Sequence, residues 1–240
     1  TDINSCTNQV SESTNVDEQP VADAGTAPDQ CGLNFTFSAV PTVGQGTWSY
    51  LSGPGTAYFI NANSATSAVQ VTAYGTYTFE WREVNGECSD NDQVTVTFNE
   101  IPVANAGTGG DECDLNFVFN AIPSVGNGTW TQVSGTGTST FVDATSATTT
   151  VTATQYGQYV YQWEEVNATC SDAATVTVNY YEQPVANAGF GGGECDLDFT
   201  LNATPSVGVG TWTATGPGTI NFTPNANGPN ALADVSAYGT

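Results

Sequence analysis

The chain has 240 residues, with a single basic residue, Arg82, no His, and 24 Asp and Glu, so its formal net charge is −23. One cation cannot neutralise a phosphate backbone, which excludes nucleic acid as a partner, and the lack of His excludes Ser-His-Asp and Cys-His catalysis. Hydrophobic residues make up 39% of the chain, enough for packed cores. No apolar run approaches the roughly 18 residues that span a bilayer, so we expect no membrane insertion.

The chain repeats itself at a step of 82 residues. Val-Ala-Asx-Ala-Gly begins at residues 21, 103 and 185, and Cys and Gly-Thr-Trp recur at the same step. The predicted domains are the C-terminal strand of a preceding repeat (1–19), two complete repeats (20–101 and 102–183) and a truncated repeat (184–240). Because the sequence stops inside a predicted strand, we expect it to be a window on a longer tandem array.

In chain order, residues 33–39, 69–73, 77–81 and 94–98 alternate apolar and polar side chains, the pattern of half-buried strands. Gly and Pro separate them, and Asn-Gly at 85–86 predicts a hairpin. About seven short strands in some 82 residues predict an all-β tandem array of immunoglobulin-like sandwiches. Tyr77 and Tyr159 occupy the position of a tyrosine corner. The expected core Trp residues are Trp48, Trp81, Trp130, Trp163 and Trp212.

Several motifs also resemble a known repeat: Pro-Val-Ala-Asp-Ala-Gly (20–25), Gly-Gln-Gly-Thr-Trp (44–48), Tyr-Gly-Thr-Tyr-Thr-Phe-Glu-Trp (74–81) and Asn-Gly-Glu-Cys-Ser-Asp-Asn-Asp (85–92). They are similar to PKD-like repeats of very large surface proteins of the Bacteroidetes, most of all to gliding-motility adhesins of the SprB type, which leave the cell by type 9 secretion. The resemblance covers nearly the whole chain and implies an extracellular filament on the cell surface, with roles in adhesion and gliding. Residues 6–16 depart from it, because they lack the alternation of the later repeats, so a weaker strand is expected there.

Six cysteines without His or a Cys-x-x-Cys motif favour disulfides in an oxidising compartment over a zinc site. Pairing within repeats would join Cys31 to Cys88 and Cys113 to Cys170. Those turns lie at opposite ends of a sandwich, about 20 Å apart, whereas a disulfide needs Cα atoms within about 7 Å. Head-to-tail repeats instead favour Cys31–Cys170 across the junction, although pairing within repeats stays open. The cysteines then left for partners outside the window are Cys6, Cys88, Cys113 and Cys195.

Aspartates flank these cysteines: Asp29, Asp90, Asp92, Asp111, Asp114 and Asp172. Head-to-tail repeats would bring them to the junctions, where several oxygen ligands suit calcium. The alternative is that they are solvated loop residues, whose like charges keep a filament dispersed. No segment matches an EF-hand loop, and calcium at the junctions is the one cofactor that we consider.

No enzyme is expected, because the candidate carboxylate pairs, Glu164 with Glu165 and Glu80 with Glu83, point to opposite faces of a strand. Two functions stay open: a stiff spacer in a surface filament for adhesion or gliding, or a glycan- or protein-binding module. The loops at 52–56, 134–138 and 215–219 are near copies, which favours the spacer. The expected partners are neighbouring repeats of the same chain, other filaments through lateral self-association, and surface or glycan ligands at an unseen tip.

Overall fold

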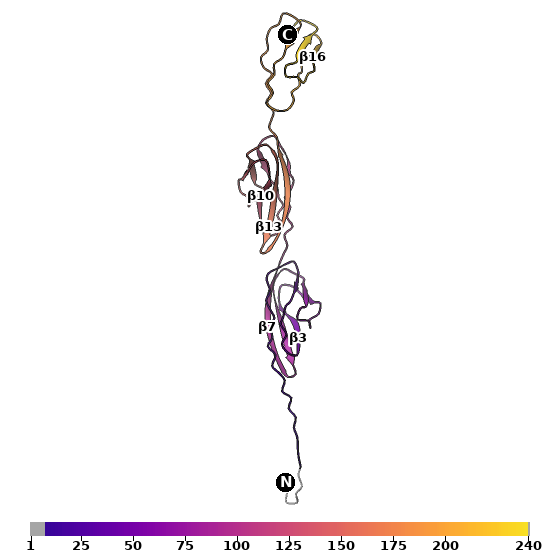
Figure 1. Ribbon diagram of the computed structural model, residues 1–240, viewed down its shortest axis with the longest axis vertical. Coiled ribbons are helices and arrows are strands. Elements are labelled where there is room, and N and C mark those ends of the chain that lie inside the picture. Colours follow the sequence, from indigo (N-terminus) through magenta and orange to yellow (C-terminus); the bar gives the residue numbers. More distant parts are fainter. Residues whose placement is uncertain (1–7, 240) are drawn as a thin grey trace.

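The computed structural model describes residues 8–239, which form two complete β-sandwich units and a partial third in a row (Figure 1). The described residues contain strands and turns and no helix, which confirms the all-β prediction. Within this part of the chain there is accordingly no helix of the length and hydropathy needed to cross a membrane.

The first unit has seven strands, as predicted: β1 (Gln30–Cys31), β2 (Asn34–Thr36), β3 (Gln45–Ser52), β4 (Ala57–Phe59), β5 (Ala68–Val71), β6 (Gly75–Asn85) and β7 (Cys88–Asn99). One sheet has the order β1-β7-β6-β3 and the other β2-β5-β4, with all pairs antiparallel except β1 with β7. The long β6–β7 hairpin turns at Gly86, where φ is +60°.

The second unit repeats this arrangement with β8 (Gly110–Glu112), β9 (Asn116–Val118), β10 (Asn127–Ser134), β11 (Ser139–Phe141), β12 (Thr150–Ala153), β13 (Gly157–Asn167) and β14 (Cys170–Tyr180). Its sheets are β8-β14-β13-β10 and β9-β12-β11. Strand number, order and register match an immunoglobulin-like sandwich in both units.

Alternation along the strands places aromatic side chains between the two sheets of each unit. Trp48 stacks on Phe37 and Trp130 on Phe119, with ring centroids 3.9 Å apart in both cases. The sixth strands contribute Trp81 and Trp163, which are also buried. Both tyrosine corners are present, because the hydroxyls of Tyr77 and Tyr159 donate to the carbonyls four residues earlier, at 2.9 and 3.0 Å.

The third unit contains β15 (Asp198–Thr200), β16 (Ile220–Thr223) and β17 (Leu232–Val235), which form one three-stranded sheet. Trp212, expected in a core, is only half-buried and lies outside any strand. The reason is that its counterparts lie on β3 and β10, which pair with β6 and β13, and the described residues of this unit contain no such partner strand.

The strand expected within residues 1–19 is absent from its described part, residues 8–19. Its counterparts, β7 and β14, each pair along their length with a sixth strand. Residues 8–19 have no such neighbour within the described chain, so their backbone gains no sheet hydrogen bonds. Cys6 lies outside the described residues. The repeat boundaries at 19/20, 101/102 and 183/184 stay predictions.

Candidate functional site

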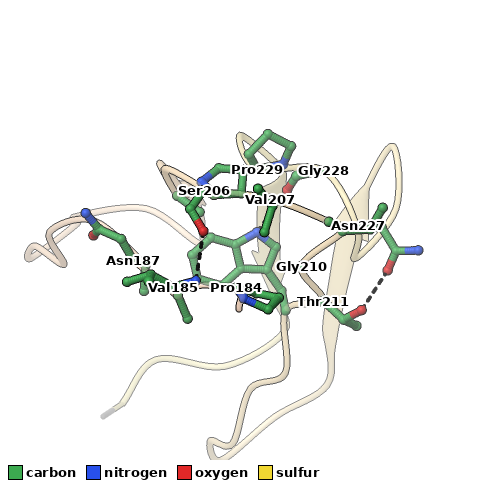
Figure 2. Close-up of a pocket in the computed structure, with 17 residues that line it drawn as sticks. Pro184, Val185, Asn187, Ser206, Val207, Gly210, Thr211, Asn227, Gly228 and Pro229 are labelled. Carbon is green, nitrogen blue, oxygen red and sulfur yellow. Dashed lines mark hydrogen bonds between the residues drawn. The ribbon is translucent and has the colours of Figure 1, made fainter. Parts of the chain in front are cut away.

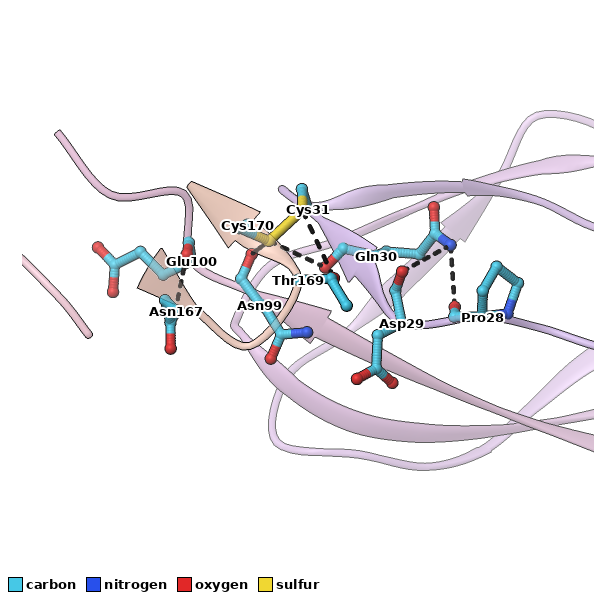
Figure 3. The surroundings of a disulfide bond; sticks show 9 residues. All are labelled: Pro28, Asp29, Gln30, Cys31, Asn99, Glu100, Asn167, Thr169 and Cys170. Atoms are coloured by element: carbon cyan, nitrogen blue, oxygen red, sulfur yellow. Dashed lines mark hydrogen bonds between the residues drawn. A yellow bond between two sulfur atoms is a disulfide. The ribbon is translucent and has the colours of Figure 1, made fainter. Parts of the chain in front are cut away.

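A disulfide joins the first unit to the second at their junction (Figure 3). It links Cys31, at the end of β1, to Cys170, the first residue of β14, with Cα atoms 5.5 Å apart and 139 residues between them in sequence. The alternative bonds Cys31–Cys88 and Cys113–Cys170 are not formed. Cys88, Cys113 and Cys195 are free thiols.

The end of β1 is held at the junction by its parallel pairing with the end of β7. Cys31 lies opposite Asn99, and the amide of Gly32 donates to the Asn99 carbonyl at 2.9 Å. On the other side, the side-chain amide of Asn167, in the turn before β14, donates to the carbonyl of Glu100 at 2.8 Å. The linker after the first unit is therefore fixed to both units beside the disulfide, as Figure 3 shows.

The same contacts occur one repeat earlier, where residues 8–19 approach the first unit. Asn85, the counterpart of Asn167, donates to the Glu18 carbonyl at 2.9 Å. The thiol of Cys88 lies 3.6 Å from the Asp17 carbonyl, as Cys170 Sγ lies 4.0 Å from the Asn99 carbonyl. The junction is therefore a property of the repeat, and Cys88 occupies the position that Cys170 has in the disulfide.

Three of the aspartates suggested as calcium ligands are occupied by backbone amides of their own unit. Ala22 and Ala24 donate to Asp90 and Asp92, each at 2.9 Å. In the second unit Ala104 donates to Asp172, also at 2.9 Å. These carboxylates fasten the entering segment of the unit to its last strand.

The other three aspartates are exposed and lie apart from one another. Asp111 accepts a hydrogen bond from Asn179 at 2.8 Å, Asp114 accepts from the amide of Asn116 at 2.7 Å, and the Asp29 carboxylate points away from the disulfide in Figure 3. In the part of the chain that the structure describes, no three His, Cys, Asp or Glu side chains gather as metal ligands. Calcium at the junctions stays a prediction.

The sequence reasoning missed a buried carboxylate in each complete unit. Glu83 and Glu165 are each 1% exposed. The one basic side chain, Arg82, is exposed and points to the face of β6 opposite Glu83. Glu165 accepts from the indole N–H of Trp163 at 2.8 Å, the amide of Ser124 at 3.0 Å and the Ser124 hydroxyl. Burial raises the pKa of Glu165, but the hydrogen bonds from Ser124 and Trp163 outweigh it and hold the pKa below its ordinary 4.5.

Glu83 has the same surroundings in the first unit. It accepts from Trp81 Nε1 at 2.9 Å, from the Thr42 hydroxyl at 2.7 Å and from the Thr42 amide at 3.0 Å. Burial again raises the pKa, and the hydrogen bonds from Thr42 and Trp81 again outweigh it. The signal in the sequence is the pair Trp-x-Glu, which places both side chains on one face of a strand.

The third unit has an open cavity of about 520 Å³ where the complete units are filled (Figure 2). Its lining includes Val185, Ser206, Gly208, Gly210 and Trp212. The Ser206 hydroxyl oxygen accepts a hydrogen bond from the Val185 amide at 2.8 Å, drawn as a dashed line in Figure 2.

No protein-family model matches the chain, and no curated protein matches it either. Among solved structures, the titin I-band fragment I67–I69 is similar at 13% identity and a TM-score of 0.49, covering 94% of this chain and 90% of its own. Extracellular domains 3–5 of Drosophila OTK give 14%, 0.46, 68% and 60%. The insect immune protein hemolin gives 10%, 0.41, 70% and 49%. At these values the immunoglobulin-like assignment rests on the strand order and register described above.

Proposed function

We propose that the chain is a stiff spacer segment of an extracellular filament on the cell surface, of the gliding-adhesin type. The observation that carries this proposal is the Cys31–Cys170 bond, which joins successive units covalently. A spacer needs successive units to keep a fixed direction, and it needs no reaction centre of its own, so we propose no enzymatic activity.

The junction has the features that limit bending. The disulfide and the hydrogen bond from Asn167 to the Glu100 carbonyl hold the units through two different segments of the second unit's hairpin and the intervening linker. A rotation about the linker would have to break one of these contacts. Two attachment points thus restrict a motion that a single linker would leave free.

The chemistry of the chain supports a place outside the cell. A structural disulfide is typical of proteins in an oxidising compartment. The net charge of −23 keeps neighbouring filaments apart at low ionic strength. The resemblance to PKD-like repeats of gliding-motility adhesins supports the finer proposal of a type 9 secretion substrate in the Bacteroidetes, with adhesive ligands bound elsewhere in the filament.

The spacer role is tested by small-angle scattering on the purified chain and on the double variant Cys31→Ser/Cys170→Ser. We expect the variant to keep folded units but to show a shorter, broader distribution of interatomic distances, because its junction bends. Cys88→Ser is the matched control and should scatter like the parent chain. Identical profiles for the parent and the double variant would refute the stiffening role of the disulfide.

The surface and motility roles are tested on living cells of the source organism with a fluorescent antibody against one repeat. Label that travels along the surface of moving cells is the expected result. Label that stays inside the cells refutes the surface role, and label that is fixed on the surface refutes the motility role.

A further inference from the structure

We propose that the third unit is an acceptor site for a β-hairpin that carries the Trp-x-Glu pattern of residues 157–180. The occupant is thus a polypeptide segment of the repeat's own type, and it enters the cavity of Figure 2. This goes beyond the spacer role, because it assigns a binding site and the chemistry of its ligand.

The first argument is the space beside two glycines that correspond to each other. A Cβ atom on Gly128 would overlap the ring of Trp163, and one on Gly46 would overlap the ring of Trp81. At Gly210, the counterpart in the third unit, a Cβ would meet nothing within 4 Å. The cavity therefore holds, in this unit, the space that an indole ring occupies in the other two.

The backbone of the site already has the shape found in the filled units. Gly126 has φ +87° and lies against the carbonyl of Val166, while Gly208 has φ +76° and meets nothing within 4 Å. A positive φ is costly for other residues but open to glycine, so this turn needs no rearrangement to receive a strand. The acceptor is preformed at this position.

A polar group is also in place for the carboxylate of the ligand. Ser124 accepts from the amide of Val103 at 2.8 Å and donates its hydroxyl hydrogen to Glu165. Ser206 makes the first of these contacts, with Val185 at 2.8 Å, and within residues 8–239 its hydroxyl donates to no acceptor. The hydroxyl of Ser206 is therefore available for a glutamate two residues after a Trp.

Backbone pairing would add to these side-chain contacts. β10 pairs with β13 from Asn127 to Ser134, whereas the corresponding residues 209–216 form no strand. Unpaired backbone N–H and C=O groups at a sheet edge accept an added strand, and side-chain pockets then select its sequence. Trp212, now half-buried, would contact the ligand Trp as Trp130 contacts Trp163, where the ring centroids are 5.3 Å apart.

The test uses the whole chain, labelled with ¹⁵N, and an unlabelled peptide of residues 156–181 that carries Cys170→Ser. We expect saturable, one-to-one changes in the NMR signals of the Trp212 indole and of Gly208 and Gly210, with the first two units unchanged. The same peptide with Trp163→Ala should cause at least a tenfold loss of affinity, consistent with about 1.4 kcal/mol or more for a buried aromatic anchor.

The matched variant of the acceptor is Gly210→Val. Nothing lies within 4 Å of its added Cβ, and Gly210 has no positive φ, so the unfilled unit should tolerate the change. The valine side chain would occupy the space of the incoming indole, and binding should be lost. Binding unaffected by Gly210→Val, or equal binding of the Trp163→Ala peptide, overturns the proposed site.

Because a free peptide can aggregate, a second form places residues 159–181 directly after Thr240, the counterpart of Gln158. Hydrogen exchange at residues 209–215 should then slow at least tenfold, and Gly210→Val should restore fast exchange. If neither the peptide, at a dissociation constant of about 1 mM or tighter, nor the appended segment produces these changes, the inference is wrong.

Discussion

The indole N–H of Trp163 donates to the buried carboxylate of Glu165, two residues later on the same face of β13, at 2.8 Å. The amide and hydroxyl of Ser124 complete its contacts, so hydrogen bonds rather than a basic side chain hold an ionised glutamate in the core. The carboxylate links β13 to the loop before β10, so it connects two neighbouring strands of one sheet through their ends.

Replacing Glu165 by Ala should destabilise the second unit by about 3 kcal/mol, because the Trp163 and Ser124 donors lose their acceptor in a buried site. The measurement is urea unfolding followed by a probe specific to that unit. Glu164→Ala is the matched control, since it removes the same charge from the opposite face of the strand and should cost less than about 1 kcal/mol. Equal losses for the two variants would contradict the role of Glu165.

The stability of both complete units should fall in acid. Glu83 and Glu165 have folded pKa values below 4.5, so the stability that they contribute is present above pH 4.5 and is lost as pH falls through the folded values. Urea unfolding from neutral pH down to about pH 3 measures this slope. The variant Glu83→Gln/Glu165→Gln should be less stable at neutral pH and show a shallower slope; an unchanged slope would assign the acid sensitivity to other groups.

The disulfide can be tested with one protease, because Arg82 is the only basic residue of the chain. Trypsin acting on the unfolded, oxidised protein should give two fragments that separate only after reduction, since Cys31 and Cys170 lie on either side of the cut. The folded chain should resist trypsin, because Arg82 lies within β6.

Two cysteine variants distinguish the possible pairings in this digest. Cys170→Ser should release the fragments without reductant, whereas Cys88→Ser should leave them joined. The opposite result would mean that Cys31 is bonded to Cys88.

Ala168, in the turn between β13 and β14, has φ +54°, a backbone conformation that suits glycine. Its counterpart in the first unit is Gly86, with φ +60°. Ala168→Gly should therefore stabilise the second unit by about 1 kcal/mol, measured by urea unfolding. The converse variant, Gly86→Ala, should destabilise the first unit, because its added Cβ would also meet the Asp17 carboxylate. Stabilisation by both changes would show that backbone strain is not the cause.

Local patterns in the sequence were sufficient to predict seven strands per complete unit, the buried Trp48 and Trp130 and the tyrosine corners, because each depends on alternation or on fixed spacing. The preferred Cys31–Cys170 pairing followed from chain topology and strand length. The role of Glu165 was missed, because its acceptor contacts come from Ser124, 41 residues away, and adjacent glutamates suggested only surface charge. Trp212 was misplaced, because its burial depends on a strand that the described part of the third unit does not contain.

The route of the chain through the Cys31–Cys170 bond also determines how the molecule responds to tension. A pull on both ends passes from Cys31 directly to Cys170, so the segment between them carries none of the load while the bond is intact. That segment spans 139 residues, roughly 470 Å of contour length at about 3.4 Å per residue. Reduction would make this hidden length extensible, and an oxidised filament of such units would therefore bear load with little elongation.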